Sequence, residues 1–170
     1  MRCAQRSTQF LPSRFTRPRA WESYTSADRS PSRNLPKCST VTDPILIDAN
    51  VLIALSFADH LHHERAVAWL GSRRTFATTP SVQGSLIRFA VRVASPTHAG
   101  DLIDLLAVHG RHVFWPDDVG YTRSMLRGVT GHGQVTDAYL AEIAVAHATK
   151  LATFDQGLAT LRPDAVELVA

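Results

Sequence analysis

From residue 44 to the end of the chain, short apolar runs alternate with longer stretches in which apolar residues recur every three or four positions. Short apolar or β-branched runs are typical of strands, whereas the longer spacing places apolar side chains on one face of a helix. The pattern predicts strands at 44–47, 75–79, 113–115, 151–153 and 166–169. It predicts helices at 49–55, 64–70, 80–93, 98–109, 119–129 and 136–150. This alternation predicts an α/β fold, with a parallel sheet and helices on its faces.

Polar residues mark where several of these helices are expected to begin. Thr136 stands at an N-cap position before the last long helix, because its hydroxyl can accept a hydrogen bond from a free backbone amide. Asn50 is expected to cap the first helix, and Asp117 and Asp118 the helix at 119–129. The helix at 80–93 is expected to bury Leu86, Phe89, Ala90 and Val93.

Three aspartates fall where the predicted elements meet one edge of the sheet. Asp48 ends the first strand, Asp155 follows the fourth, and Asp137 lies in the first turn of the helix between them in sequence. Taken singly, each has a structural explanation as a cap, a turn residue or a charge that offsets a helix dipole. Taken together, they lie at the edge where open α/β sheets bind ligands. Three such carboxylates would repel one another unless a cation neutralised them.

This cluster is suited to Mg²⁺, which prefers oxygen ligands and usually keeps several waters. A bound metal ion can activate an attacking water and stabilise charge on a phosphate. The candidate ligands are therefore Asp48, Asp137 and Asp155, with Asn50 and Thr153 as candidate hydrogen-bond donors that orient them.

A second group of metal-binding residue types, Asp59-His60-Leu61-His62-His63-Glu64, precedes the predicted helix at 64–70. Three histidines suggest zinc, but the adjacent His62 and His63 would point about 100° apart on a helix. There is also no HExxH motif and no partner cysteine nearby. The alternative is a solvated helix start that could touch a substrate phosphate.

The composition fits one domain with an appendage. The chain has 170 residues, 45% of them hydrophobic, which is enough for a sizeable core. No apolar run approaches the length that spans a membrane. Cys3 and Cys38 both lie near the start, so the rest of the chain holds neither a disulfide nor a cysteine metal site. This usage suits a reducing cytoplasm.

Residues 1–43 differ from everything after them. They are rich in Arg, Ser, Thr and Pro without any hydrophobic period, and eight basic residues face three acidic ones. This extension is therefore expected to be disordered and carries a net charge of +5, which leaves −2 for residues 44–170 of a chain whose total is +3. Three explanations stay open: a translation start near Val41, a disordered segment that contacts RNA loosely, or a targeting peptide.

Three segments together resemble a known family: ILIDANVLIAL at 45–55, TTPSVQGSLIRF at 78–89 and QVTDAYLAEIAVAHATKLATFDQGL at 134–158. With FWPDD at 114–118, their order and spacing look like the PIN domain, specifically the VapC-type ribonuclease toxins of bacterial toxin–antitoxin pairs. The resemblance covers residues 44–170. It implies a three-layer α/β/α fold with a mostly parallel central sheet. It also implies an endoribonuclease that depends on Mg²⁺ or Mn²⁺ and hydrolyses RNA phosphodiester bonds, a cognate VapB-type antitoxin and a homodimer.

The family's site residues carry over position by position. Its first, third and fourth acids match Asp48, Asp137 and Asp155. The second acid, usually Glu on the helix after the second strand, aligns with Gln83. A Gln carbonyl can bind Mg²⁺ or orient a water, but it carries no charge and cannot act as a base. The substitution leaves open whether one or two metal ions bind.

Because residues 44–170 are net acidic, RNA would need local basic groups. The candidates are Arg88, Arg92, Arg123, Arg127 and His132. Arg88 and Arg92 lie one turn apart on a predicted helix and could equally form a solvated face. Single-stranded loops are the expected target because their bases and backbone are accessible.

Two other functions compete with an active toxin. The first is a catalytically weak PIN-fold protein that binds RNA or an antitoxin, which is motivated by Gln83. The second is a phosphoryl-transfer enzyme with a strand-end aspartyl nucleophile. The second lacks the usual DxD pair, because Asn50 stands two residues after Asp48.

Overall fold

The computed structural model describes residues 44–71 and 75–170 of the chain. The strands are β1 (Ile45–Ile47), β2 (Phe76–Thr78), β3 (His112–Phe114), β4 (Leu151–Thr153) and β5 (Val166–Leu168). The helices are α2 (Ala49–Ser56), α3 (His63–Gly71), α4 (Pro80–Val93), α5 (Pro96–Val108), α6 (Gln134–Ala146) and α7 (Gln156–Leu161). The expected extension at 1–43, with its three explanations, lies outside the described residues.

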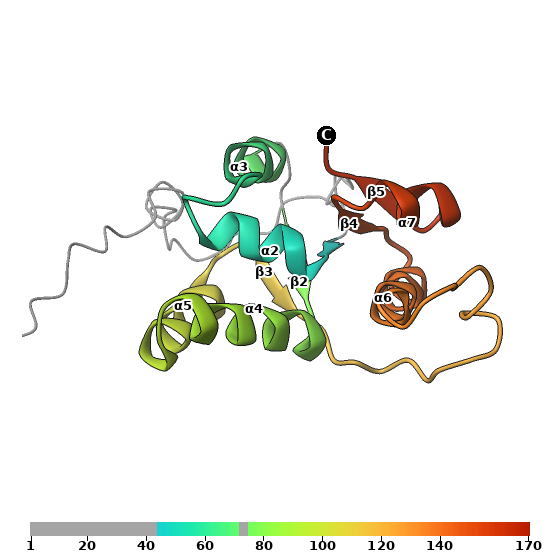
Figure 1. Ribbon diagram of the computed structural model, residues 1–170, viewed down its shortest axis with the longest axis horizontal. Helices are drawn as coiled ribbons and strands as arrows, with labels where there is room; N and C mark the ends of the chain where they lie inside the picture. The colour runs from blue at the N-terminus through green and yellow to red at the C-terminus, as the bar shows by residue number, and fades with distance from the viewer. Residues whose placement is uncertain (1–43, 72–74) are drawn as a thin grey trace, which may run out of the picture.

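The five strands form one parallel sheet in the order β3-β2-β1-β4-β5, which confirms the predicted fold class. Strand β1 is central, and Leu46 pairs with Ala77 on one side and Leu151 on the other. Its residues Ile45–Ile47 are all buried, as expected for a parallel strand covered on both faces. Helices α2, α3, α4 and α5 gather on one side of the view in Figure 1, and α6, α7, β4 and β5 on the other.

The sheet and its helices form the three-layer α/β/α arrangement. Helix α4 packs against α2 and α5, while α6 packs against β1 and β4. All strands run parallel, so their carboxyl ends meet at one edge of the sheet. The segments that leave this edge are the ones that hold the candidate site residues. No helix among the described residues is long and apolar enough to cross a membrane.

The expected N-caps at Thr136 and Asn50 are wrong. Helix α6 begins at Gln134, where the Gln134 side chain accepts hydrogen bonds from the backbone N–H and the hydroxyl of Thr130. Helix α2 begins at Ala49, so Asp48 occupies the N-cap position and Asn50 lies within the first turn. Neither helix has a side-chain capping hydrogen bond at its N-cap, so a capping side chain does not mark where either helix begins.

The expected helix at 119–129 is also wrong. Residues 115–133 form turns and irregular backbone between β3 and α6, anchored by the fully buried Met125. Asp117 instead accepts hydrogen bonds from Ser81 N (3.2 Å) and Ser81 Oγ (2.6 Å), at the start of α4. Asp118 lies 3.6 Å from His147 Nε2, and that histidine ring stacks on Trp115.

Two smaller expectations differ as well. Helix α6 ends at Ala146, four residues before the predicted Lys150. Ala148 there adopts a left-handed conformation with φ of 54°, and Thr149 N–H donates to Ala144 O, which is a common way for a helix to end. On α4, Leu86 and Ala90 are buried as expected, but Val93 is 52% exposed because it lies in the helix's last turn.

Candidate active site

Asp48 is held at the carboxyl end of the central strand. Its backbone N–H donates to Ala152 O at 2.9 Å, which continues the pairing of β1 with β4. The Thr153 hydroxyl donates to Asp48 Oδ2 at 2.9 Å, and both side chains are buried. One carboxylate oxygen is therefore fixed by Thr153, which also sets the direction of the other.

Asp155 follows β4 and is tied to the same threonine. Its backbone N–H donates to Thr153 Oγ1 at 3.1 Å. Its Oδ1 accepts from Leu158 N at 3.0 Å, so Asp155 caps α7. A Cβ at Gly157 would lie 3.1 Å from Asp155 Oδ1, so a larger residue there would crowd the carboxylate. The capping role proposed for a lone strand-end aspartate therefore exists at Asp155, alongside its place at the acidic edge.

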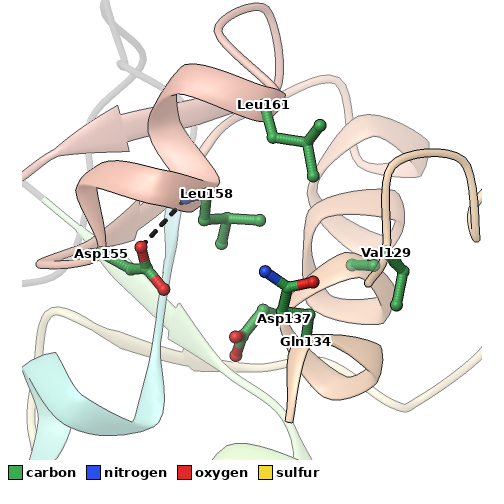
Figure 2. Close-up of a pocket in the computed structure, with 7 residues that line it drawn as sticks. Val129, Gln134, Asp137, Asp155, Leu158 and Leu161 are labelled. Atoms are coloured by element: carbon green, nitrogen blue, oxygen red, sulfur yellow. Dashed lines mark hydrogen bonds between the residues drawn. The ribbon is translucent and has the colours of Figure 1, made fainter. Parts of the chain in front are cut away.

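Asp137 reaches the site from α6. It lines a small pocket with Asp155, whose other walls are apolar or amide side chains from the segment before α6, from α6 itself and from α7. Figure 2 shows the carboxylates of Asp137 and Asp155 turned toward the same space between the two helices. The first turn of α6 thus brings a third carboxylate to the edge that already carries Asp48 and Asp155.

Burial and the repulsion of neighbouring carboxylates raise the pKa of Asp137 and the pKa of Asp48. Burial, followed by the charges of Asp48 and Asp155, raises the pKa of Asp137 to about 6. Burial also raises the pKa of Asp48, against the opposing effects of the Thr153 hydroxyl and the backbone amides of Ala49 and Asn50. The charge of Asp155 adds to that rise. The charge of Asp155 therefore acts on both other aspartates, and the charge of Asp48 acts on Asp137.

The donor chemistry at this edge suits a hard divalent cation, because it consists of carboxylate oxygens that repel one another without a counter-charge. The side chains do not stand as a finished coordination shell. Within residues 44–71 and 75–170, no three His, Cys, Asp or Glu side chains converge closely enough to hold a metal ion.

Gln83 lies in the first turn of α4, directly after the carboxyl end of β2. Its Nε2 donates to Thr78 Oγ1 at 3.0 Å. Strand β2 is the neighbour of β1, so Gln83 lies on the same edge of the sheet as Asp48. Asn50 is exposed in the first turn of α2, whereas Thr153 contacts Asp48 directly.

The candidate RNA-binding arginines are exposed but spread over two segments. On α4, Arg88 donates to Ser85 Oγ and Arg92 lies over the Phe89 ring. Arg123 and Arg127 belong to the irregular segment at 115–133, and the exposed His132 lies at its end.

Sequence analysis did not identify the aromatic and basic group beside Asp155. The His62 ring lies 4.7 Å from the Phe154 ring, and the Arg65 guanidinium lies 4.9 Å from the same ring. Arg65 also donates to Val169 O. Of the other histidines, His63 Nδ1 lies 2.8 Å from Ala54 O, so its ring is directed into the fold. Only the spacing of His62 and Arg65 on consecutive turns could have indicated a shared face.

The fold and this edge define a class of protein, namely a three-layer α/β domain with an acidic site at the carboxyl edge of its parallel sheet. Comparison with known proteins agrees with that class. The model of the PIN domain matches residues 45–162. Ribonuclease VapC29 of Mycobacterium tuberculosis is 49% identical over 127 residues, which cover 74% of this chain and 96% of that protein. Ribonuclease VapC44 of the same organism is 40% identical over 124 residues, covering 67% and 87%.

A solved structure shares the fold. The crystal structure of VapC20 from Mycobacterium tuberculosis, a toxin that cleaves the sarcin-ricin loop, matches with a TM-score of 0.54. That match covers 69% of this chain and 94% of VapC20 at 13% sequence identity, so it bears on the fold alone. The chain belongs to the PIN domain family and, within it, to the VapC-type proteins.

Proposed function

We propose that this protein is a metal-dependent endoribonuclease, the toxin of a type II toxin–antitoxin system, which hydrolyses RNA phosphodiester bonds in the cytoplasm. The observation that carries the proposal is that, in a PIN domain, the charges of Asp48 and Asp155 help to raise the pKa of Asp137 at the carboxyl edge of the sheet. VapC-type ribonucleases generally depend on divalent metal ions, and Mg²⁺ or Mn²⁺ suits these carboxylate donors.

In this proposal the three aspartates hold the cation. When bound, the cation activates a water and stabilises charge on the scissile phosphate. Thr153 keeps Asp48 in place by occupying one carboxylate oxygen. Asp155 is fixed by the backbone of α7, and Asp137 is carried by the rigid first turn of α6. Gln83 contributes a neutral group at the β2 side of the edge.

RNA would approach through Arg88, Arg92, Arg123 and Arg127, which are all exposed. The family membership supports a VapB-type antitoxin as a partner and a homodimer as the assembly. Helix α4 offers an apolar surface for either contact, because Ile87 and Val91 lie one turn apart and are 39% and 44% exposed.

The decisive experiment incubates the purified protein with structured RNA, with Mg²⁺ or Mn²⁺ and with a chelator. Asp48→Asn and Asp137→Asn preserve side-chain size but remove charge, and Asp104→Asn on the exposed surface of α5 is the matched control. We expect metal-dependent cleavage in the native protein and in the control, and its loss in the other two variants. Cleavage that persists in both site variants would refute the proposal.

The second candidate, a weak PIN-fold binding protein, is favoured by Gln83 at the position of the family's second acid. It predicts RNA or antitoxin binding without cleavage. Restoration of cleavage by Gln83→Glu would then locate the defect at this residue.

A further inference from the structure

We propose that Arg162 is a positioning residue that holds α6, α7 and the segment at 115–133 around the pocket in which Asp137 faces Asp155. The inference rests on the proposed function, because it makes this pocket part of the ribonuclease site. It is carried by the contacts of the Arg162 guanidinium with parts of the chain that lie far apart in the sequence.

Three parts of the chain form the walls of this pocket. The segment at 115–133 contributes Val129, α6 contributes Asp137, and α7 contributes Leu158 and Leu161. Asp155, at the N-cap of α7, completes the acidic side. Figure 2 shows these side chains around one space between the two helices. The distance between the two carboxylates therefore depends on how these three parts are held together.

Arg162 bonds the same three parts. It is the C-cap of α7, where its backbone N–H donates to Leu158 O at 2.9 Å. Its Nη1 lies 3.1 Å from Glu142 Oε1 on α6, and its Nη2 donates to Met125 O in the segment at 115–133. A guanidinium can serve both acceptors at once, because its N–H donors form a rigid planar fork. One side chain thus ties together all the walls of the pocket.

Both side-chain contacts are partly shielded from water. The Arg162 side chain is 19% exposed and that of Glu142 is 30% exposed, while Met125 is fully buried. Hydrogen bonds to a charged donor are stronger than neutral ones, and a partly buried acceptor that loses its donor is costly. These contacts should therefore resist separation of the three parts better than a surface ion pair would.

The segment at 115–133 comes closest to α7 at Gly128. Gly128 has a φ of 80°, which favours glycine, and a Cβ there would lie 2.5 Å from Leu161 Cδ1. Leu161 is a wall of the pocket and directly precedes Arg162. The bond from Arg162 to Met125 lies just before this contact along the chain, so it holds the segment against the end of α7.

Each of the two helices carries one pocket aspartate and one member of the ion pair. Asp155 and Arg162 cap the two ends of α7, and Asp137 and Glu142 both lie on α6. Because a short helix behaves as a rigid element, the ion pair at one place fixes the separation of the carboxylates at another. Arg162 therefore acts on the acidic pocket without touching it.

Hydrogen exchange of the metal-free protein tests this role. Arg162→Gln removes the charge and both side-chain contacts. Lys150→Gln is the matched control, because it removes the same charge and a bond to Pro163 O that lies outside the pocket lining. We expect Arg162→Gln to speed amide exchange at 122–138 about tenfold and to leave Ile45–Ile47 unchanged. Exchange that stays slow at 122–138, that rises equally at Ile45–Ile47, or that rises equally in Lys150→Gln would overturn the proposal.

Metal binding and kinetics separate positioning from simple stabilisation of the fold. Glu142→Ala breaks only the tie to α6, whereas Arg162→Gln also frees the segment that carries Arg123 and Arg127. In calorimetry below the unfolding temperature, we expect both variants to bind Mn²⁺ about tenfold more weakly, as when groups that orient metal ligands are lost. Only Arg162→Gln should also raise KM for RNA, and Arg162→Lys, which keeps the charge without the fork, should recover part of both losses.

Native Mn²⁺ affinity in both variants would mean that Arg162 only stabilises the fold, and would overturn the proposal. If the native protein itself bound no Mn²⁺, the proposed function would fail. Hydrogen exchange needs neither metal nor RNA, so it would still decide the role of Arg162, and the two failures are distinguishable.

Discussion

At the scale of single residues, Asp137 shows how neighbouring carboxylates weaken the fold that carries them. Its side chain is half-buried in α6, and it senses the charges of Asp48 and Asp155. The pKa of Asp137 rises from 3.8 to about 6 on folding. The folded protein therefore binds more protons than the unfolded chain between these two values, and stability falls as pH rises through that window.

Asp137→Asn should therefore stabilise the metal-free protein at neutral pH. The gain should be absent near pH 3.8, grow up to about pH 6 and then stay level, because the native carboxylate is then fully ionised. After allowance for solvent screening, we expect a gain on the order of 1 kcal/mol. Urea unfolding at several pH values with a chelator measures it, and Asp104→Asn is the control. A variant less stable than the native protein at pH 7 would contradict this assignment.

At the scale of secondary-structure elements, Asp117 links the irregular segment at 115–133 to α4. It reaches across 36 residues to bond the backbone N–H and hydroxyl of Ser81. Thr79, at the N-cap position of α4, makes no capping bond of its own. The helix that carries Gln83 therefore depends on a distant residue for its N-terminal acceptor.

Asp117→Ala should lower the free energy of unfolding by about 1 kcal/mol, the usual effect of losing an N-terminal acceptor. Asp118→Ala is the neighbouring control, because that carboxylate is 47% exposed and lies 3.6 Å from His147. Its loss should change stability by less than about 0.5 kcal/mol. Urea unfolding compares the two variants. Equal effects would show that Asp117 does not act as the cap of α4.

Local sequence patterns predicted most of the strands and helices, but not where the helices are capped. The five strands and the helices α2 to α6 follow from local apolar patterns, and the structure contains them. The caps at Thr136 and Asn50 failed because α6 begins two residues before Thr136 and α2 one residue before Asn50, and Asp117 accepts from Ser81 on α4 and caps no helix at 119–129. The false helix at 119–129 failed because Met125 is buried by tertiary packing and not by a helical face.

The candidate site also has one part that could be predicted from the sequence and one part that could not. Asp48 and Asp155 were predicted because strand ends of a parallel sheet share an edge, and Asp137 because it opens a helix there; the family resemblance pointed to the same three acids. The contacts of Arg162 with Glu142 and Met125 join residues 20 and 37 positions apart on separate parts of the chain. Tertiary packing brings them together, so a reading of local motifs could not reveal them.

At the scale of the whole molecule, the extension and the domain carry net charges of opposite sign. Residues 1–43 carry +5 and residues 44–170 carry −2. The PIN domain match begins at residue 45, and the 127 residues aligned with VapC29 cover 96% of that protein. The family match therefore does not extend into residues 1–43, which hold the net positive charge of the chain.

A fragment of residues 44–170 should therefore unfold at the same temperature as the full chain and cleave RNA with the same kcat at saturating substrate. Its affinity for RNA should be lower and should depend less on salt, because each phosphate contact adds about 0.7 to the slope of log K against log salt for single strands. Thermal unfolding tests the first expectation, and binding at several salt concentrations tests the second.

A full chain with the extension's arginines replaced by glutamine is the matched control and should bind like the fragment. If the fragment bound RNA with an unchanged salt slope, the basic extension would make no phosphate contacts. If it failed to fold, the domain boundary at residue 44 would be wrong.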